Sequence, residues 1–192
     1  MERHLGAKVR RIIVGEAHGR VLEIGVGTGA SFSYYPHDAQ VIGIEPDPYM
    51  LARAEGRRAD DGFDQIELRQ APAEQLPFED ASFDHVVSTL VLCTVRDVPQ
   101  ALAEARRVLR PGGTLRFFEH VRNDESRFWG VIQDAIVPIW SWIGAGCHPN
   151  RRTEQAIADA GFAIESVERA RAGPGTPAIY GVARRDLGGE RA

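Results

Sequence analysis

The stretch VLEIGVGTGASFSYYP, residues 21–36, decides the fold of this chain. An apolar run passes through an acid, Glu23, and three glycines then follow on alternate positions, Gly25, Gly27 and Gly29. A short apolar run that stops in a glycine turn is typical of a buried strand. Because glycine lacks a Cβ, the backbone of such a turn can approach a bound ligand closely. The stretch therefore predicts a strand followed by a loop that holds a nucleotide-like cofactor.

Strand and helix patterns alternate along the rest of the chain. Further strands are predicted at 40–46, within 65–78, and at 83–92, 114–121, 163–170 and 177–185. Helical spacing marks 46–59, 98–110 and 153–162, and PGG at 111–113 is predicted to stop the second of these helices. This alternation predicts an α/β fold with a doubly wound, mostly parallel seven-stranded sheet that ends in an antiparallel C-terminal hairpin.

Composition sets the broad class of the protein. The 192 residues are 43% hydrophobic and 26% charged, with a formal net charge of −4, which favours a single globular domain over 1–192 and no nucleic-acid partner. The two cysteines, Cys93 and Cys147, have no metal-binding spacing, so we expect no metal site and a cytoplasmic location. We also expect a solvated first helix around 7–14, and neither a signal peptide nor a membrane span.

Residues 122–153 break the alternating pattern and are predicted to be an insertion. Large apolar side chains in it are expected to form a lid or pocket wall, namely Phe128, Trp129, Trp140, Trp142 and Ile143. Core packing alone is the alternative.

The glycine spacing and two acids indicate which cofactor binds. In parallel sheets, ligands bind past the carboxyl ends of the strands, where the glycine turn and Glu45 after the second strand both lie. Dinucleotide loops have the spacing G-x-G-x-x-G, whereas this loop has G-x-G-x-G. Glu23 would repel a pyrophosphate but suits a cation, and Glu45 can accept hydrogen bonds from ribose hydroxyls. The pattern favours S-adenosylmethionine (SAM) over a nicotinamide cofactor.

Four segments then carry a family resemblance in the right order: VLEIGVGTG at 21–29, VIGIEPDPYM at 41–50, AEQLPFEDASFDHVV at 73–87 and RVLRPGG at 107–113. Together they resemble the motifs of class I SAM-dependent methyltransferases, which have a Rossmann-like fold. More narrowly, LVLCTVRD at 90–97, FFEHV at 117–121 and IYGVA at 179–183 resemble the methyltransferase-like 7 group, which is implicated in thiol S-methylation.

The resemblance implies a set of cofactor contacts. The backbone of Gly25, Gly27 and Gly29 would lie under the methionine part of SAM, with Glu23 near its ammonium group. Glu45 would bind the ribose. The adenine side would be formed by Pro46, Ala73 and Glu74. Thr89 and Leu90 would present a backbone carbonyl to the amino group of SAM. The product of methyl transfer would be S-adenosylhomocysteine.

The acceptor side is predicted from residues that follow the fifth strand. His120 is the candidate base or polarising group, and His148 and Arg151 are candidates to hold a thiolate or carboxylate of the substrate. We expect a small, fairly apolar acceptor, with a thiol favoured because its thiolate is already nucleophilic. The alternatives are a small-molecule N- or O-methyltransferase, a phospholipid N-methyltransferase in contact with a membrane, and a non-catalytic SAM-binding module.

Overall fold

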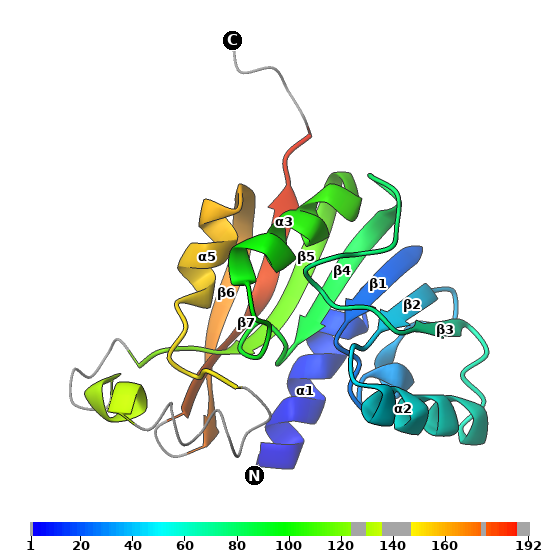
Figure 1. The fold of residues 1–192 in the computed structure, drawn as a ribbon, viewed down its shortest axis with the longest axis horizontal. Helices are drawn as coiled ribbons and strands as arrows, with labels where there is room; N and C mark the ends of the chain where they lie inside the picture. The colour runs from blue at the N-terminus through cyan, green and yellow to red at the C-terminus, as the bar shows by residue number, and fades with distance from the viewer. Residues whose placement is uncertain (1, 124–129, 136–146, 174–175, 188–192) are drawn as a thin grey trace.

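A computed structural model describes residues 2–123, 130–135, 147–173 and 176–187, and its elements alternate as the sequence predicts (Figure 1). The strands are β1 (Arg20–Ile24), β2 (Gln40–Ile44), β3 (Ile66–Arg69), β4 (Phe83–Thr89), β5 (Leu109–His120), β6 (Phe162–Gly173) and β7 (Thr176–Arg185). The helices are α1 (Glu2–Val14), α2 (Pro48–Asp60), α3 (Val98–Val108) and α5 (Thr153–Asp159), with a 3-10 turn, η1 (Phe32–Tyr34).

Within these described residues, seven strands form one sheet in the order β3-β2-β1-β4-β5-β7-β6. The pairs from β3 across to β5 are parallel, and β7 is antiparallel to both β5 and β6. This confirms the predicted doubly wound sheet and its antiparallel C-terminal pair. The strand order reverses between β1 and β4, which makes the carboxyl ends of these two strands the switch point where ligands bind in such sheets.

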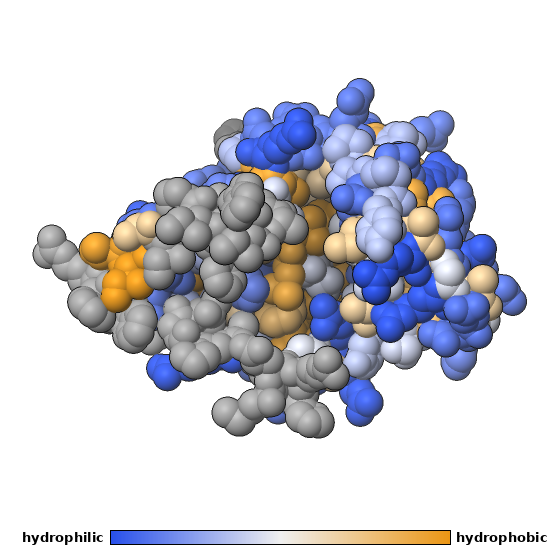
Figure 2. All heavy atoms as spheres, turned by 60° about the horizontal axis from the view of Figure 1, so that its bottom comes forward, coloured by the Kyte–Doolittle hydropathy of each residue, from blue (hydrophilic) through white to orange (hydrophobic). Residues whose placement is uncertain are grey.

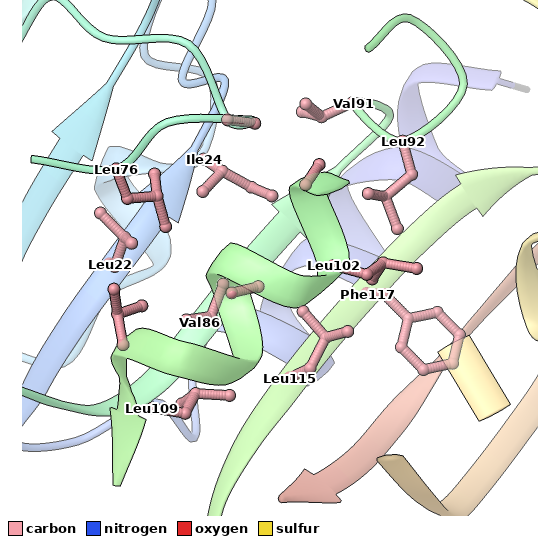
Figure 3. Close-up of a cluster of buried hydrophobic side chains, with 14 of the residues drawn as sticks. Leu22, Ile24, Leu76, Val86, Val91, Leu92, Leu102, Leu109, Leu115 and Phe117 are labelled. Carbon is pink, nitrogen blue, oxygen red and sulfur yellow. The ribbon is translucent and has the colours of Figure 1, made fainter. Parts of the chain in front are cut away.

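Helices cover both faces of the sheet. Side chains of α3 and α5 pack on one face, where Leu102 of α3 lies beside Leu115 and Phe117 of β5 (Figure 3). Side chains of α1 and α2 belong to the core on the other face, with Ile13 and Ala54 among its members. The alternation of strand side chains produces these two cores, and burying apolar surface on both faces stabilises the sheet.

Two local predictions need correction. The first helix is solvated on one face only, because α1 exposes Lys8 and Arg11 but buries Val9, Ile13 and Val14 against the sheet. The fifth strand begins at Leu109, before the PGG sequence, because Leu109 pairs with Phe83 and a register shift follows.

The Trp-rich insertion lies largely outside the described residues, including its three tryptophans, Phe128 and Ile143. In the described part of the chain, no helix combines the length and apolarity needed to cross a membrane.

Candidate active site

The glycine loop follows β1 at the switch point. Gly25, Gly27 and Gly29 all have positive φ angles, of 64°, 56° and 77°, which glycine adopts at little cost. A Cβ on Gly25 would lie 2.6 Å from a methyl carbon of Val91, so the loop packs closely against the segment after β4. A Cβ on Gly27 would meet no atom within 4 Å. Open space therefore lies over the backbone of Gly27, where a ligand can approach it.

Glu45 follows β2 and fastens the glycine loop. One carboxylate oxygen accepts a hydrogen bond from the Gly27 N–H at 2.9 Å, and the other accepts one from the Asp47 N–H at 3.1 Å. A carboxylate offers about four acceptor positions, so about two remain for a pair of hydroxyl groups. The next residue, Pro46, is exposed, and its carbonyl accepts a hydrogen bond from the Gln70 side chain at 3.0 Å.

Glu23 lies on β1 and is fully buried. Its carboxylate accepts a hydrogen bond from the Tyr35 hydroxyl at 3.0 Å. Burial raises the pKa of Glu23 to about 7, and hydrogen bonds from Ser31 and Tyr35 and the charge of Arg10 oppose that rise. Burial and the neighbouring Glu23 also raise the pKa of Tyr35. A cation brought near this carboxylate would favour its charged form.

The loops after β3 and β4 form the other wall of the candidate site. Ala73 is buried, and Glu74 accepts hydrogen bonds from the N–H groups of Arg96, at 2.8 Å, and Asp97, at 3.3 Å. Glu74 therefore fixes the segment that leads into α3, and its contact with a cofactor stays a prediction. Thr89 ends β4 nearly buried.

Leu90 has a left-handed backbone, with φ of 61°, and its N–H donates to the Phe118 carbonyl at 2.7 Å. A non-glycine residue in that region is strained, and such strain clusters at functional sites.

Glu119 holds the segment after β4 in place. It is fully buried near the end of β5 and accepts hydrogen bonds from the Ser88 hydroxyl at 2.6 Å and from the N–H groups of Val91, at 3.1 Å, and Cys93, at 3.4 Å. Burial raises the pKa of Glu119, while these hydrogen bonds favour its charged form. The sequence shows Glu119 at the end of an apolar strand, but it does not show that the partners of Glu119 lie in the segment after β4.

The structure brings the three predicted acceptor-side residues to one loop cluster. Half-buried His120 ends β5, with its Nδ1 atom 3.8 Å from Cys147 Sγ. The His148 N–H donates to the Cys93 carbonyl at 2.7 Å. Arg151 donates to the carbonyls of Leu92 and Val95, at 2.5 and 2.7 Å. Arg151 therefore braces the loop after β4, and burial lowers the pKa of its guanidinium.

The cysteines lie close to this histidine despite their separation in sequence. The ligand atoms of Cys93, His120 and Cys147 all lie within 4.8 Å of one another, and both cysteines are buried. The thiol of Cys93 has a raised pKa, through its hydrogen bond with Cys147 and through burial. Cysteine spacing gave no signal of this cluster, because the two loops meet only in the folded chain.

A cavity of about 380 Å³ begins beside Val121, one residue past His120. The charged side chains that line it are four arginines and one glutamate, namely Arg122, Arg151, Arg152, Arg169 and Glu154. The carboxyl edge of the parallel strands, turned forward in Figure 2, is hollowed, with hydrophobic residues on the floor of the hollow. The edge thus combines an apolar floor with a cavity lined by arginines, two of which pair with acids.

These features define a site for a cofactor that contains a nucleoside. The open backbone at Gly27 and the spare acceptor positions of Glu45 lie together at the switch point, bridged by a hydrogen bond. The sequence elements that build them match the methyltransferase domain family over residues 22–117.

Two curated relatives resemble most of the chain. The human thiol S-methyltransferase TMT1B is 35% identical over 170 residues, which cover 88% of this chain and 70% of that protein. The phosphatidylethanolamine N-methyltransferase of Cereibacter sphaeroides is 34% identical over 158 residues, which cover 82% of this chain and 75% of that protein. The chain spans between 59% and 70% of the length of the thiol S-methyltransferases that it matches in human, rat and mouse.

Among solved structures, the YcgJ protein of Bacillus subtilis shares the fold with a TM-score of 0.78 at 18% identity. The alignment covers 97% of this chain and all of that one. The chain belongs to the class I SAM-dependent methyltransferases. It is therefore an enzyme whose cofactor is SAM, and within the family it is similar to the thiol S-methyltransferases.

Proposed function

We propose that this enzyme transfers the methyl group of SAM to the sulfur of a small, fairly apolar thiol. SAM supplies an electrophilic methyl group on a sulfonium. The open backbone at Gly27 supports placing the methionine part there, and Glu45 retains acceptor positions for the two ribose hydroxyls. Gly25 and Gly29 shape the same loop, and Glu23 sits beneath it with a carboxylate that a nearby ammonium would favour in its charged form.

The remaining cofactor contacts follow from the loops around the site. Pro46 and Ala73 would flank the adenine, with Glu74 holding the loop that carries Ala73. Thr89 and Leu90 would present a backbone carbonyl to the amino group of SAM, since they stand where β4 ends.

The charge of the acceptor side is the observation that favours a thiol. Four arginines and one glutamate line the cavity past His120. Arg122 pairs with Asp134 at 2.7 Å and Arg169 pairs with Glu154 at 3.6 Å, so the charges around the cavity still sum to a net positive value. Positive charge stabilises a thiolate, which is the nucleophile in S-methylation. An amine instead becomes a cation as it is methylated, and the same arginines oppose that change. The apolar floor of the hollow suits a hydrophobic acceptor (Figure 2).

Residues around the hollow would align the acceptor and accept its proton. His120 would take the thiol proton, and its position at the end of β5, where its ring is half-buried, supports this role. Arg151 braces the loop after β4 and adds positive charge, while His148 joins its own loop to Cys93 through the backbone. Exclusion of water and alignment then supply much of the rate.

Phosphatidylethanolamine is the second candidate acceptor. The relative from Cereibacter sphaeroides supports it at almost the same identity as the thiol S-methyltransferases. The arginines that favour a thiolate would also attract a lipid phosphate. In that case the apolar hollow would face the membrane.

The test follows release of S-adenosylhomocysteine with three acceptors in parallel. These are an alkyl thiol, the matched thioether that has no S–H group, and vesicles that contain phosphatidylethanolamine. Release with the thiol alone supports the proposal. Release with the vesicles alone overturns it in favour of the lipid, and SAM binding without release across thiols, amines and phenols would favour a non-catalytic SAM-binding module.

A further inference from the structure

Three metal-ligating side chains converge beside the acceptor hollow. Cys93 comes from the segment after β4, His120 from the end of β5, and Cys147 from the segment before α5. Their ligand atoms lie within 4.8 Å of one another, and the Cys147 Sγ to His120 Nδ1 distance is 3.8 Å. The proposed thiol transfer needs neither cysteine as a nucleophile, because the acceptor attacks the methyl group directly.

The distance between His120 and Cys147 suits a tetrahedral zinc ion, and the other two ligand pairs lie within 4.8 Å. With zinc–sulfur bonds of about 2.3 Å and zinc–nitrogen bonds of about 2.0 Å, a sulfur and a nitrogen ligand stand roughly 3.6 Å apart, and two sulfurs stand roughly 3.8 Å apart. The spacing of His120 and Cys147 is already close to this value. Thiolate and imidazole ligands favour zinc over magnesium or calcium. Three protein ligands also leave a fourth position open, as in catalytic rather than structural zinc sites.

The backbone holds the ligands from several sides. The Cys93 N–H donates to Glu119 at 3.4 Å, and its carbonyl accepts from the His148 N–H at 2.7 Å. The second of these bonds ties the loop of Cys93 directly to the residue after Cys147. Three ligands on a braced frame lose little conformational freedom when an ion binds, which favours affinity.

The cluster also lies on the cofactor side of the hollow. Val91, two residues before Cys93, packs against Gly25 so closely that a Cβ there would lie 2.6 Å from it. The segment that carries Cys93 therefore contacts the loop expected to hold the methionine part of SAM.

We propose that Cys93, His120 and Cys147 bind a zinc ion whose fourth position takes the sulfur of the acceptor thiol. The metal half of this inference stands alone, and the acceptor half rests on the proposed function. On binding, the thiol releases its proton to solvent and remains as a thiolate, because a coordinating thiol is deprotonated. Its lone pair then forms the new sulfur–carbon bond. The methyl–sulfonium bond breaks with its electron pair staying on the cofactor sulfur, and the neutral thioether leaves the metal. His120 serves as a ligand in this scheme, so the metal takes over its role in deprotonation.

The test loads the reduced, metal-free full chain with Co²⁺, which replaces zinc and is coloured. Cys93 and Cys147 are the only cysteines in the sequence, so any absorption from a cobalt–thiolate bond reports this site. We expect one equivalent of Co²⁺ with thiolate charge-transfer bands and the intense visible bands of tetrahedral cobalt, both displaced by Zn²⁺. Cys93→Ser and Cys147→Ser should each remove roughly half of the charge-transfer intensity, because each leaves one of two thiolates.

His18→Gln is the matched control for His120→Gln. His18 precedes β1 at the opposite edge of the sheet, where it bonds Asp38 at 3.1 Å. The control should keep the cobalt spectrum, and His120→Gln should weaken Co²⁺ affinity at least about tenfold. Wild-type protein without thiolate bands, or with uptake no higher than that of the double cysteine variant, would overturn the metal site. The thiolate bands are looked for in the wild-type protein itself, so their absence cannot be attributed to misfolding of a variant.

Adding the alkyl thiol separates the two halves of the inference. We expect the charge-transfer band to gain intensity as a third thiolate joins the metal. Thiol methylation with an unchanged cobalt spectrum would overturn the acceptor half. Cobalt–thiolate bands in a protein that methylates no thiol would support the metal site and contradict the proposed function instead.

Discussion

Removing the Glu45 carboxylate is the sharpest test of where the cofactor lies. The Glu45→Ala variant loses the acceptor for two backbone N–H groups, those of Gly27 and Asp47. It also loses the two acceptor positions that remain for ribose hydroxyls. The substitution therefore acts on the glycine loop and on the cofactor together, and the assay must separate these effects.

The expected magnitude follows from the charge of the carboxylate. A hydrogen bond to a charged group contributes about 1.5 to 3 kcal/mol. Water that takes the place of the missing carboxylate would partly solvate the ribose hydroxyls. We therefore expect the binding free energy of SAM to weaken by the equivalent of one such hydrogen bond. SAM affinity should then fall on the order of 10- to 150-fold. Loss of the two backbone hydrogen bonds should also lower the free energy of unfolding.

Calorimetric titration with SAM measures this affinity, and thermal unfolding of the same samples checks the fold. Glu67→Ala is the matched control, since it removes the same charge from the neighbouring strand β3, where the carboxylate pairs with Arg69 at 2.7 Å. A cofactor analogue that lacks both ribose hydroxyls should bind wild type and Glu45→Ala with nearly equal affinity. A folded Glu45→Ala protein with wild-type SAM affinity would refute the placement of the ribose.

Three further predictions test other parts of the site. Gly27→Ala should weaken SAM binding, because its Cβ enters the open space over the loop, and its positive φ should lower the free energy of unfolding by about 1 to 2 kcal/mol. Gly29→Ala should mainly lower stability, because its Cβ would overlap the Phe32 ring. SAM affinity and unfolding are measured on both variants, and a larger loss of affinity in Gly29→Ala would contradict the prediction. Burial raises the pKa of Glu23 from 4.5 to about 7, so its contribution to stability is present below the unfolded pKa and is lost as the pH rises through 7, by about 3 kcal/mol in total. Denaturant titrations of wild type and Glu23→Gln should diverge over that window, and parallel curves would contradict the shift. His120→Ala should lower kcat more than it lowers SAM affinity. An unchanged kcat would indicate that His148 or water, rather than His120, accepts the thiol proton.

The fold was readable from sequence because its signals are local. Short apolar runs that end at Glu45 or at the glycine turn mark the carboxyl ends of strands, and parallel pairing gathers those ends at one edge. The start of β5 was misplaced because PGG usually ends a strand or helix. Here Leu109 pairs with Phe83 before the PGG sequence. The next pair is His85 with Thr114, and the register shift between the two pairs accommodates residues 111–113.

The acceptor side was only partly readable, because its contacts join distant segments. Candidate residues were visible where the strands end, as with His120. That Arg151 binds the carbonyls of the loop after β4, or that Cys93 meets Cys147, depends on how the segment after β5 returns to the sheet. No local pattern encodes that return path, so the candidate residues could be predicted but their partners could not.

Tracking the methyl group itself tests the central claim most directly. The enzyme is incubated with SAM that carries a deuterated methyl group, an alkyl thiol and an ethanolamine lipid together, and the products are identified by mass spectrometry. We predict that the label appears on the sulfur of the thiol with wild-type protein and is strongly reduced with Glu45→Ala. Label on the amine of the lipid, or on neither acceptor, would contradict the account.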